Sequence, residues 1–242
     1  GSAMPSEIRL HVKQLLAKEQ CVPLTKEQCH YLFGVMRLGL GDTVLLFNGR
    51  DGEWRSDIVR TGKRSGLLRL QEQMAPLVMP PDVWLLFAPI KKARTDFIVE
   101  KAVEMGVARI QPVQTEFTNS SRVQRDRLQA HAVEAAEQCG ATYVPEVGDL
   151  ERLDRILADW DESRRILFCD EAKAGQRLAL PDQRGPWAIL IGPEGGFSER
   201  ERERLLAHPF RHSISLGPRI LRADTAAIAA LTIWQQRLGD WV

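Results

Sequence analysis

Cysteine is scarce in the 242-residue sequence, and its placement excludes two classes of small protein. The four cysteines, at positions 21, 29, 139 and 169, are scattered along the chain and include no C-x-x-C pair. This spacing argues against a disulfide framework and against a structural zinc site, and it suits a reducing cytosol. We therefore expect a cytoplasmic protein that binds no metal.

Long apolar runs and an excess of one charge are also missing. No run reaches the length that a transmembrane helix needs, and no signal peptide is visible, so we expect no membrane partner. The formal net charge is only +1, so a nucleic-acid partner would have to be held by local basic patches. The length allows one large domain or two modest ones. Residues 1–3, before Met4, are expected to be an expression scar.

Two short runs near the C-terminus carry the strongest signal. Residues 189–198 have the sequence ILIGPEGGFS, and residues 216–226 have the sequence LGPRILRADTA. Each apolar run ends at a glycine and is followed by a helical pattern, which is typical of a buried strand that stops at a loop. Two such strand ends side by side would form a crevice at the carboxyl edge of an α/β sheet, where ligands usually bind.

The composition of these loops narrows the kind of ligand site. Neither loop contains Gly-Lys-Ser/Thr or G-x-G-x-x-G, which argues against a Walker-type phosphate loop and a dinucleotide fingerprint. Gly192, Gly195 and Gly196 remove three side chains from one loop, so its backbone amides could approach a ligand closely. One such loop alone could equally be an ordinary turn, and the pair is the more specific signal.

The chain divides at a proline-rich stretch. Residues 74–81 hold three prolines, which predicts a semi-rigid linker. Before it, we predict a small β-barrel with strands over 8–12, 43–47, 53–60 and 67–70. A helix from Thr25 to Met36 is expected to begin with a capping box, because Gln28 follows Thr25 by three residues.

After the linker, strands alternate with helices. The apolar run 83–88, the amphipathic helix 95–105 and the strand 109–113 predict a strand–helix–strand unit and therefore a parallel sheet. Further helices are predicted over 126–139 and 150–160, from 199 after the N-cap Ser198, and from about 224. Further strands are predicted over 165–170, 187–191 and 213–216.

The two C-terminal runs closely resemble the signature of the RsmE family of 16S rRNA uracil-N3 methyltransferases, which belong to the SPOUT superfamily. The resemblance extends to residues 30–42 and 134–140, although Ala141 and Asp224 stand where the family usually has Arg and Glu. It implies a PUA-like β-barrel over residues 4–76 and a trefoil-knotted α/β domain over 77–242. It also implies S-adenosylmethionine as methyl donor and a homodimer.

The resemblance assigns the cofactor to the two loops. Loop amides and carbonyls there would hold the adenine of S-adenosylmethionine. The candidate cofactor-binding residues are Ile191, Gly192, Pro193, Gly195, Gly196, Leu216, Gly217, Ile220, Leu221, Thr225 and Ala226.

The proposed chemistry needs alignment, a proton acceptor and a cation. Methyl transfer is an in-line displacement that alignment of donor and acceptor accelerates. Uracil N3 must lose its proton, and the resulting charge spreads onto two carbonyl oxygens. Arg222 is our candidate cation, with a salt bridge to Glu194 or Asp224 as the alternative. Glu194 is the nearest candidate acceptor, with loop capping as its alternative.

RNA contacts are expected from basic residues near the crevice. Lys91, Lys92 and Arg94 lie between a predicted strand and helix at its edge, where positive charge suits an anionic substrate. Arg37 is a further candidate phosphate contact, with simple solvation as the alternative. Three functions remain open. The first is an RsmE-type enzyme that acts on 16S rRNA, which we expect it to meet within the small ribosomal subunit. The others are another SPOUT enzyme, such as a ribose 2′-O methyltransferase, and a non-catalytic RNA-binding assembly factor.

Overall fold

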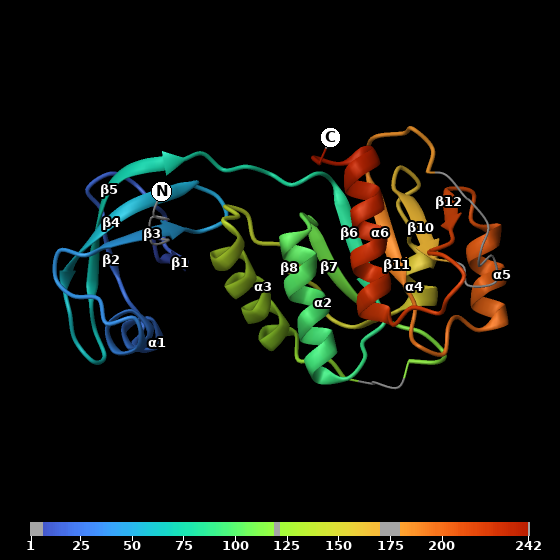
Figure 1. Cartoon of the computed structure of the whole chain (residues 1–242), viewed down its shortest axis with the longest axis horizontal. Coiled ribbons are helices and arrows are strands. Elements are labelled where there is room, and N and C mark those ends of the chain that lie inside the picture. Colours follow the sequence, from blue (N-terminus) through green and yellow to red (C-terminus); the bar gives the residue numbers. More distant parts are fainter. Residues whose placement is uncertain (1–6, 119–121, 170–179, 242) are drawn as a thin grey trace. The chain divides into compact units, whose positions relative to one another are not determined.

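The computed structural model describes residues 7–118, 122–169 and 180–241, and its chain forms two compact units (Figure 1). Unit 1 consists of Gly1–Met79 with Ala136–Val144, and unit 2 consists of Pro80–Ala135 with Pro145–Val242. Each unit has its own sheet. The predicted expression scar lies outside the described residues. No helix of the described part is long and apolar enough to span a bilayer.

Unit 1 is built on a five-stranded sheet in the order β1-β3-β4-β5-β2. Only β1 and β3 pair in parallel, and irregularities in the β4–β5 register curl the sheet. Its core holds Leu32, Val44, Leu46 and Leu68, each with no exposed surface. The strands are Arg9–His11 (β1), Cys21–Pro23 (β2), Thr43–Phe47 (β3), Glu53–Arg60 (β4) and Leu67–Ala75 (β5).

The predicted helix of unit 1 begins where the sequence places it. Thr25 and Gln28 form the predicted capping box, with Gln28 N donating to Thr25 Oγ1 at 3.2 Å. One α-helical segment, Lys26–Cys29 (α1), continues as a π-helical segment, His30–Val35 (η1). The chain then leaves the helix through Arg37, which adopts a left-handed φ of 57°.

Segment 136–144 is tied to unit 1 through Arg9. The Arg9 guanidinium donates to the carbonyl oxygens of Ala136, Glu137 and Ala141 at 2.6, 3.0 and 2.8 Å, and to Glu53 at 2.6 Å. Ala141 takes part through its backbone alone, so this contact does not depend on the side chain at that position. Sequence periodicity does not reveal this attachment, because it joins residues more than a hundred positions apart.

Unit 2 contains a parallel sheet in the order β12-β10-β11-β6-β7-β8, with the short β9 also paired to β7. All five residues of the central strand β11 are buried, as the apolar run predicts. The strands are Val83–Phe87 (β6), Arg109–Gln114 (β7), Glu146–Val147 (β8), Glu151–Arg152 (β9), Arg165–Cys169 (β10), Trp187–Ile191 (β11) and Arg211–Ile214 (β12).

Helices complete unit 2. Lys92–Glu104 (α2) and Ala223–Leu238 (α6) lie side by side (Figure 1), and Gln235 of α6 donates to the Met105 carbonyl at 2.6 Å. Leu153–Ala158 (α4) and Glu199–Ala207 (α5) enclose a second apolar cluster with alternate residues of β11, Ala188 and Leu190. Arg125–Cys139 (α3) runs beyond unit 2, and its last residues belong to unit 1.

Several predicted boundaries are wrong, for tertiary reasons. The last strand covers 211–214 and not 213–216, because its pairing with β10 ends at Cys169 and Ile214. The predicted helix over 150–160 shrinks to α4, because Glu151 and Arg152 pair with β7. Strand β5 extends to Ala75 through pairing with β4, and helix α2 begins at 92 and not at 95.

Candidate functional site

The two glycine-containing loops follow β11 and β12 at the carboxyl edge of the unit 2 sheet. Loop A, residues 192–197, leads from β11 to α5, and loop B, residues 215–222, leads from β12 to α6. Strand β10 lies between β11 and β12, so the expectation that the two strand tips are direct neighbours is wrong. Cys169, the last residue of β10, lies between the two loops.

The loops nevertheless bound adjoining cavities. A cavity of about 240 Å³ is lined by loop A with the ends of β10 and β11, and one of about 70 Å³ is lined by loop B. Both linings contain Cys169, Leu221 and Ala226. The two cavities therefore form one hollowed region that both loops share, although the strands before them are not paired.

Most of the candidate cofactor residues line this region. Five line the larger cavity, three line the smaller one, and two line both; Thr225 is exposed in the first turn of α6 and lies outside both linings. The five are Ile191, Gly192, Pro193, Gly195 and Gly196, the three are Leu216, Gly217 and Ile220, and the two are Leu221 and Ala226.

Sequence reasoning missed the contribution of β10 and α5. Phe168 and Cys169 of β10 and Arg202 of α5 also line the larger cavity, as does Phe197 of loop A. Phe168 and Cys169 end a strand of the same parallel sheet, but only the strand order shows that this strand lies between the other two.

The loop A glycines serve different purposes. A Cβ at Gly192 would lie 2.9 Å from the ring of Phe197, so this glycine makes room for an aromatic side chain of the same loop. Phe197 in turn meets Phe168 edge to face, with ring centroids 6.4 Å apart. Gly196 needs glycine for its conformation, since its φ is +75°. The same holds for Gly217 in loop B, whose φ is +99°.

A single arginine joins three segments beside the cavities. Arg94, in the first turn of α2, donates to Glu194 Oε1 in loop A at 2.5 Å and to Asp224 Oδ1 in α6 at 2.8 Å. Hydrogen bonding to Arg94 lowers the pKa of both carboxyl groups, and the two carboxylates raise the pKa of Arg94 further. A salt bridge to one of these carboxylates was the alternative role considered for Arg222, and the structure gives both pairs to Arg94.

The two catalytic candidates have different surroundings. Glu194 lines the larger cavity, but the lowered pKa that Arg94 imposes makes it a weak base in this state. Arg222 is exposed at the N-cap of α6 and makes no ion pair with any residue that the structure describes. Asp224 and Thr225 lie in the first turn of α6, whose N-cap is Arg222.

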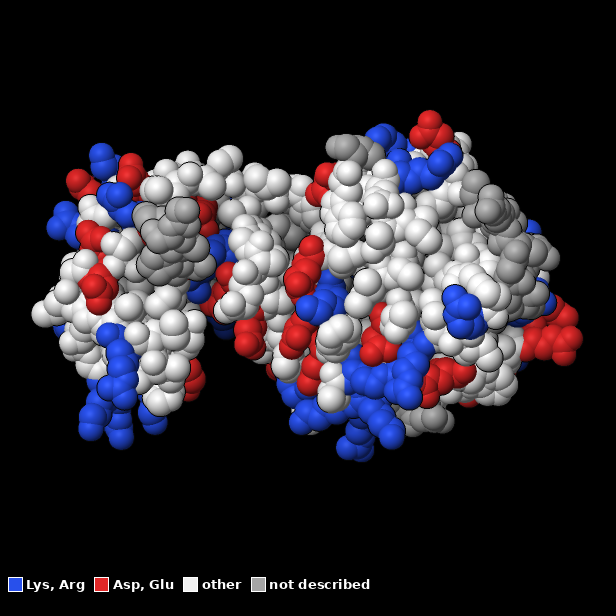
Figure 2. All heavy atoms as spheres, viewed as in Figure 1, with Lys and Arg blue, Asp and Glu red and all other residues white. Residues whose placement is uncertain are grey.

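Basic side chains gather beside this edge of unit 2. Lys91 and Lys92 are exposed where α2 begins, and Figure 2 shows Lys and Arg side chains clustered at the lower edge of this unit, below α2 and α6 of Figure 1. Lys101 pairs with Glu104 at 2.7 Å and contributes no free charge. Arg37 is exposed in unit 1. Among the described residues, no cluster of His, Cys, Asp and Glu could hold a metal ion.

The lining suits a ligand that has both a flat apolar part and polar groups. Loop B offers the side chains of Leu216, Ile220 and Leu221, and the end of β12 offers Ile214, so a planar ring can bury its faces among them. Loop A offers backbone in a stretch where three of six residues have no side chain. A nucleoside that carries a polar tail has this combination of surfaces.

Comparison with known proteins defines the class. The RNA methyltransferase domain family matches residues 78–235, and the RNA methyltransferase PUA domain family matches residues 24–71. The chain is therefore a two-part RNA methyltransferase-type protein. The predicted fold class, a PUA-like domain followed by a parallel-sheet α/β domain of the SPOUT type, is confirmed.

Full-length relatives define the family. The chain is 30% identical over 228 residues to ribosomal RNA small subunit methyltransferase E of Rickettsia conorii, covering 92% of this chain and 93% of the relative. It is also 30% identical over 240 residues to the protein of that name from Buchnera aphidicola subsp. Schizaphis graminum, covering 96% and 97%. The chain belongs to this family, the RsmE family.

Solved structures of similar proteins contain a cofactor. Ribosomal RNA small subunit methyltransferase E from Neisseria gonorrhoeae bound to S-adenosyl methionine superposes with a TM-score of 0.89 at 25% identity, covering 98% of this chain and 100% of that one. A putative methyltransferase from Legionella pneumophila, in complex with the bound cofactor SAM, also has a TM-score of 0.89, at 29% identity and with 97% and 99% coverage.

Proposed function

We propose that this protein transfers a methyl group from S-adenosylmethionine to N3 of a uridine in small-subunit (16S) ribosomal RNA. The observation that carries the proposal is the pair of adjoining cavities formed by loops A and B, in a chain of the RsmE family. We expect it to act in the cytoplasm, where its rRNA substrate lies, on RNA within the small ribosomal subunit.

The chain's own residues can accommodate S-adenosylmethionine, which supplies an activated methyl group on a sulfonium. The apolar side chains of Leu216, Ile220 and Leu221 would cover the adenine, and Gly192 to Gly196 would hold the polar part with loop backbone. Thr225, outside both linings, would be reached only by an extended end of the cofactor. We further expect the trefoil knot and the homodimer that the family resemblance implies.

The charged residues at the cavity edge would act on the uracil. Arg222 has no ion pair with a described residue, so its guanidinium is available to stabilise the charge that develops on the uracil carbonyl oxygens. Glu194 can accept the N3 proton only once Arg94 has released it, because Arg94 lowers its pKa. An RNA phosphate at Arg94 would compete with Glu194 and would restore its basicity.

The basic side chains would hold the RNA backbone. Lys91 and Lys92 are exposed and adjacent to Arg94, so the start of α2 presents three cations at the edge of the cavities. Phosphate contacts of this kind position a substrate without reading its sequence. Arg37 would provide a separate phosphate contact from unit 1.

The test uses rRNA that lacks the modification. Small subunits and naked rRNA, both from cells without the endogenous enzyme, are incubated with the protein and labelled S-adenosylmethionine, and the modified nucleoside is identified by mass. We expect 3-methyluridine at one position. A label on ribose 2′-O would identify a different SPOUT activity. No label, together with no cofactor binding by calorimetry, would identify a non-catalytic RNA-binding protein.

A further inference from the structure

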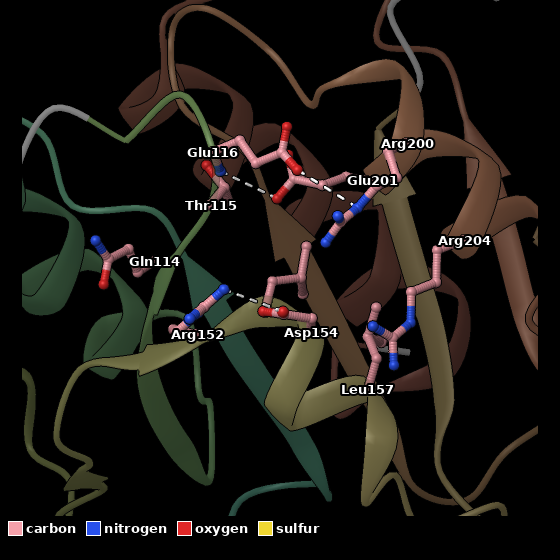
Figure 3. A pocket seen from close by; sticks show the side chains of 10 residues that line it. Gln114, Thr115, Glu116, Arg152, Asp154, Leu157, Arg200, Glu201 and Arg204 are labelled. Carbon is pink, nitrogen blue, oxygen red and sulfur yellow. Dashed lines mark hydrogen bonds and ion pairs between the residues drawn. The ribbon is translucent and has the colours of Figure 1, made fainter.

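A third cavity lies in unit 2, and it shares no lining residue with the two cavities of the loops A and B. It measures about 330 Å³ and lies between the carboxyl end of β7, the start of α4 and helix α5 (Figure 3). Six of its ten lining residues are charged: Glu116, Arg152, Asp154, Arg200, Glu201 and Arg204. Neither the cofactor nor the methyl transfer proposed above uses any of them.

Three guanidinium groups lie around this cavity, from opposite sides. Arg200 and Arg204 project from α5, and Arg152 projects from β9 (Figure 3). Arg200 and Arg204 are four residues apart on one helix, and like charges at this spacing destabilise a helix. A negatively charged group bound between them would attract both guanidinium groups and offset this repulsion.

The carboxylates of the cavity neutralise these arginines only in part. Glu201 is engaged by backbone, because its two oxygens accept from Ser198 N at 3.0 Å and from Glu116 N at 3.1 Å. The Arg152–Asp154 pair is 3.3 Å long and the Arg200–Glu116 pair is 3.6 Å long, and the two arginine side chains are 68% and 75% exposed. Exposed pairs of this kind contribute little and exchange readily.

Arg204 is the cation that remains. Within the described ranges of the chain it has no ion pair, although it lines the cavity beside Leu157 (Figure 3). A guanidinium presents its donors in a fixed fork that matches two oxygens of a phosphate. When Arg152 and Arg200 release their weak partners, the three arginines can therefore bind one phosphate group together.

The cavity is linked to loop A through short contacts. Ser198, the N-cap of helix α5, directly follows loop A, and its hydroxyl accepts from Glu201 N at 3.1 Å. Glu201 also holds Glu116, and the next residue, Phe117, lies where a Cβ at Gly195 would touch it at 3.4 Å. A group bound in this cavity thus lies next to the segments that shape the larger cavity of loop A.

We propose that this three-arginine cavity binds a phosphodiester of the RNA substrate and anchors the strand beside the methylation site. The inference rests on the proposed function, since it assigns the cavity to the RNA substrate of that reaction. It adds a phosphate contact on the α4/α5 side of the sheet, remote in sequence from the lysines at the start of α2.

The experiment compares Arg204→Gln with Arg155→Gln in the full-length protein. Arg155 lies on α4, is exposed and does not line this cavity, so its variant carries the same charge change elsewhere. Loss of one phosphate contact should reduce the slope of log affinity against log salt by about 0.7–0.9 and weaken rRNA binding about five-fold at 0.15 M salt. The KM for rRNA should rise by a similar factor with kcat unchanged, and Arg155→Gln should match wild type in all three.

Two further measurements separate a lost phosphate contact from other causes of weaker rRNA binding. Cofactor affinity by calorimetry should be unchanged in Arg204→Gln, and the thermal midpoint should not fall, because the variant breaks no ion pair with a described residue and removes the repulsion with Arg200. Titration with inorganic phosphate, against chloride at equal ionic strength, tests whether the cavity takes the free ion instead. Equal salt slopes for the two variants would overturn the proposal. If wild type also bound inorganic phosphate, the cavity would be a site for the free ion. If it did not, the result would fit a cavity that binds an acidic protein partner instead.

Failure of this inference and of the proposed function are separable. If wild type methylates rRNA but the two variants bind it with equal slopes, the cavity is not an RNA anchor and the function stands. If wild type binds rRNA without methylating it, the function fails, and the difference between the two slopes still decides whether the cavity is an anchor.

Discussion

The variant Gly192→Ala adds one methyl group to loop A and tests whether the loop needs a glycine at this position. Gly192 directly follows β11, and an added Cβ would lie 2.9, 3.1 and 3.2 Å from three ring carbons of Phe197. Carbon atoms pack at about 3.5–4.0 Å, so the ring must move by roughly 0.5–1 Å. The ring meets Phe168 at a centroid distance of 6.4 Å, and both rings line the larger cavity.

The expected cost follows from this confinement. Overpacking of this kind reduces the free energy of unfolding by about 1–3 kcal/mol. If the ring keeps its contact with Phe168, it moves into the cavity, and cofactor affinity should fall about ten-fold, which corresponds to about 1.4 kcal/mol. If it leaves Phe168, the aromatic pair contributes a further loss of about 0.5–1.5 kcal/mol to stability.

The assay combines urea denaturation with calorimetric titration of S-adenosylmethionine. Gly39→Ala is the matched control, because a Cβ at Gly39 meets nothing within 4 Å. Adding Phe197→Leu to Gly192→Ala should recover part of both losses, because the smaller side chain relieves the contact. Unchanged stability and affinity in Gly192→Ala, or no recovery in the double variant, would refute this account of the loop.

Three further predictions concern the charged and capping residues. Arg94→Gln should flatten the loss of stability on acidification: Glu194 and Asp224 have folded-state pKa values below their unfolded values, so their contribution is present above about pH 4 and is lost as the pH falls through the folded values. Denaturation between pH 2 and about pH 6 measures this. Arg222→Ala should leave cofactor binding intact and slow rRNA methylation by about 10²-fold or more in single-turnover assays. Ser198→Ala removes the N-cap of α5 and should cost about 0.5–2 kcal/mol in chemical denaturation.

Each of these has a control or a contrary outcome. Lys101→Gln breaks the surface pair with Glu104 and should leave the acid dependence nearly unchanged, since both side chains are more than a third exposed. A normal methylation rate in Arg222→Ala would end its catalytic assignment. For the cap, Ser198→Thr should retain most of the stability, and a loss equal to that of the alanine variant would show that the hydroxyl is not what matters.

Local signals in the sequence predicted the elements well where the determinant is local. The Thr25 and Ser198 caps lie where they were expected, because a capping box needs only residues three positions apart. The central strand β11 was recognisable from five consecutive apolar residues, all of which are buried in the structure. Strand β12 was misplaced by two residues, because its end is set by pairing with β10 and not by its own hydrophobicity.

The candidate site shows the same division. The glycines and apolar residues in and beside loops A and B gave eleven candidate cofactor residues, and ten of these line the cavities. Ion pairs with Glu194 or Asp224 were considered only as the alternative role of Arg222, whereas Arg94 makes both, from 100 and 130 positions away. Sequence proximity favoured the wrong arginine, since α2 and α6 come together only in the folded unit.

By itself, the sequence determined the two-part organisation, the parallel α/β class of the second part and the loops that line the cavities, because short-range patterns encode strands, caps and glycine turns. The resemblance of its two C-terminal runs pointed to the RsmE family. Only the tertiary structure decided that β10 separates β11 and β12, that Arg94 joins loop A to α6, and that three arginines surround a separate cavity. The physical reason is that strand order and long-range ion pairs depend on how segments far apart in the sequence pack together. Local sequence patterns do not encode that packing.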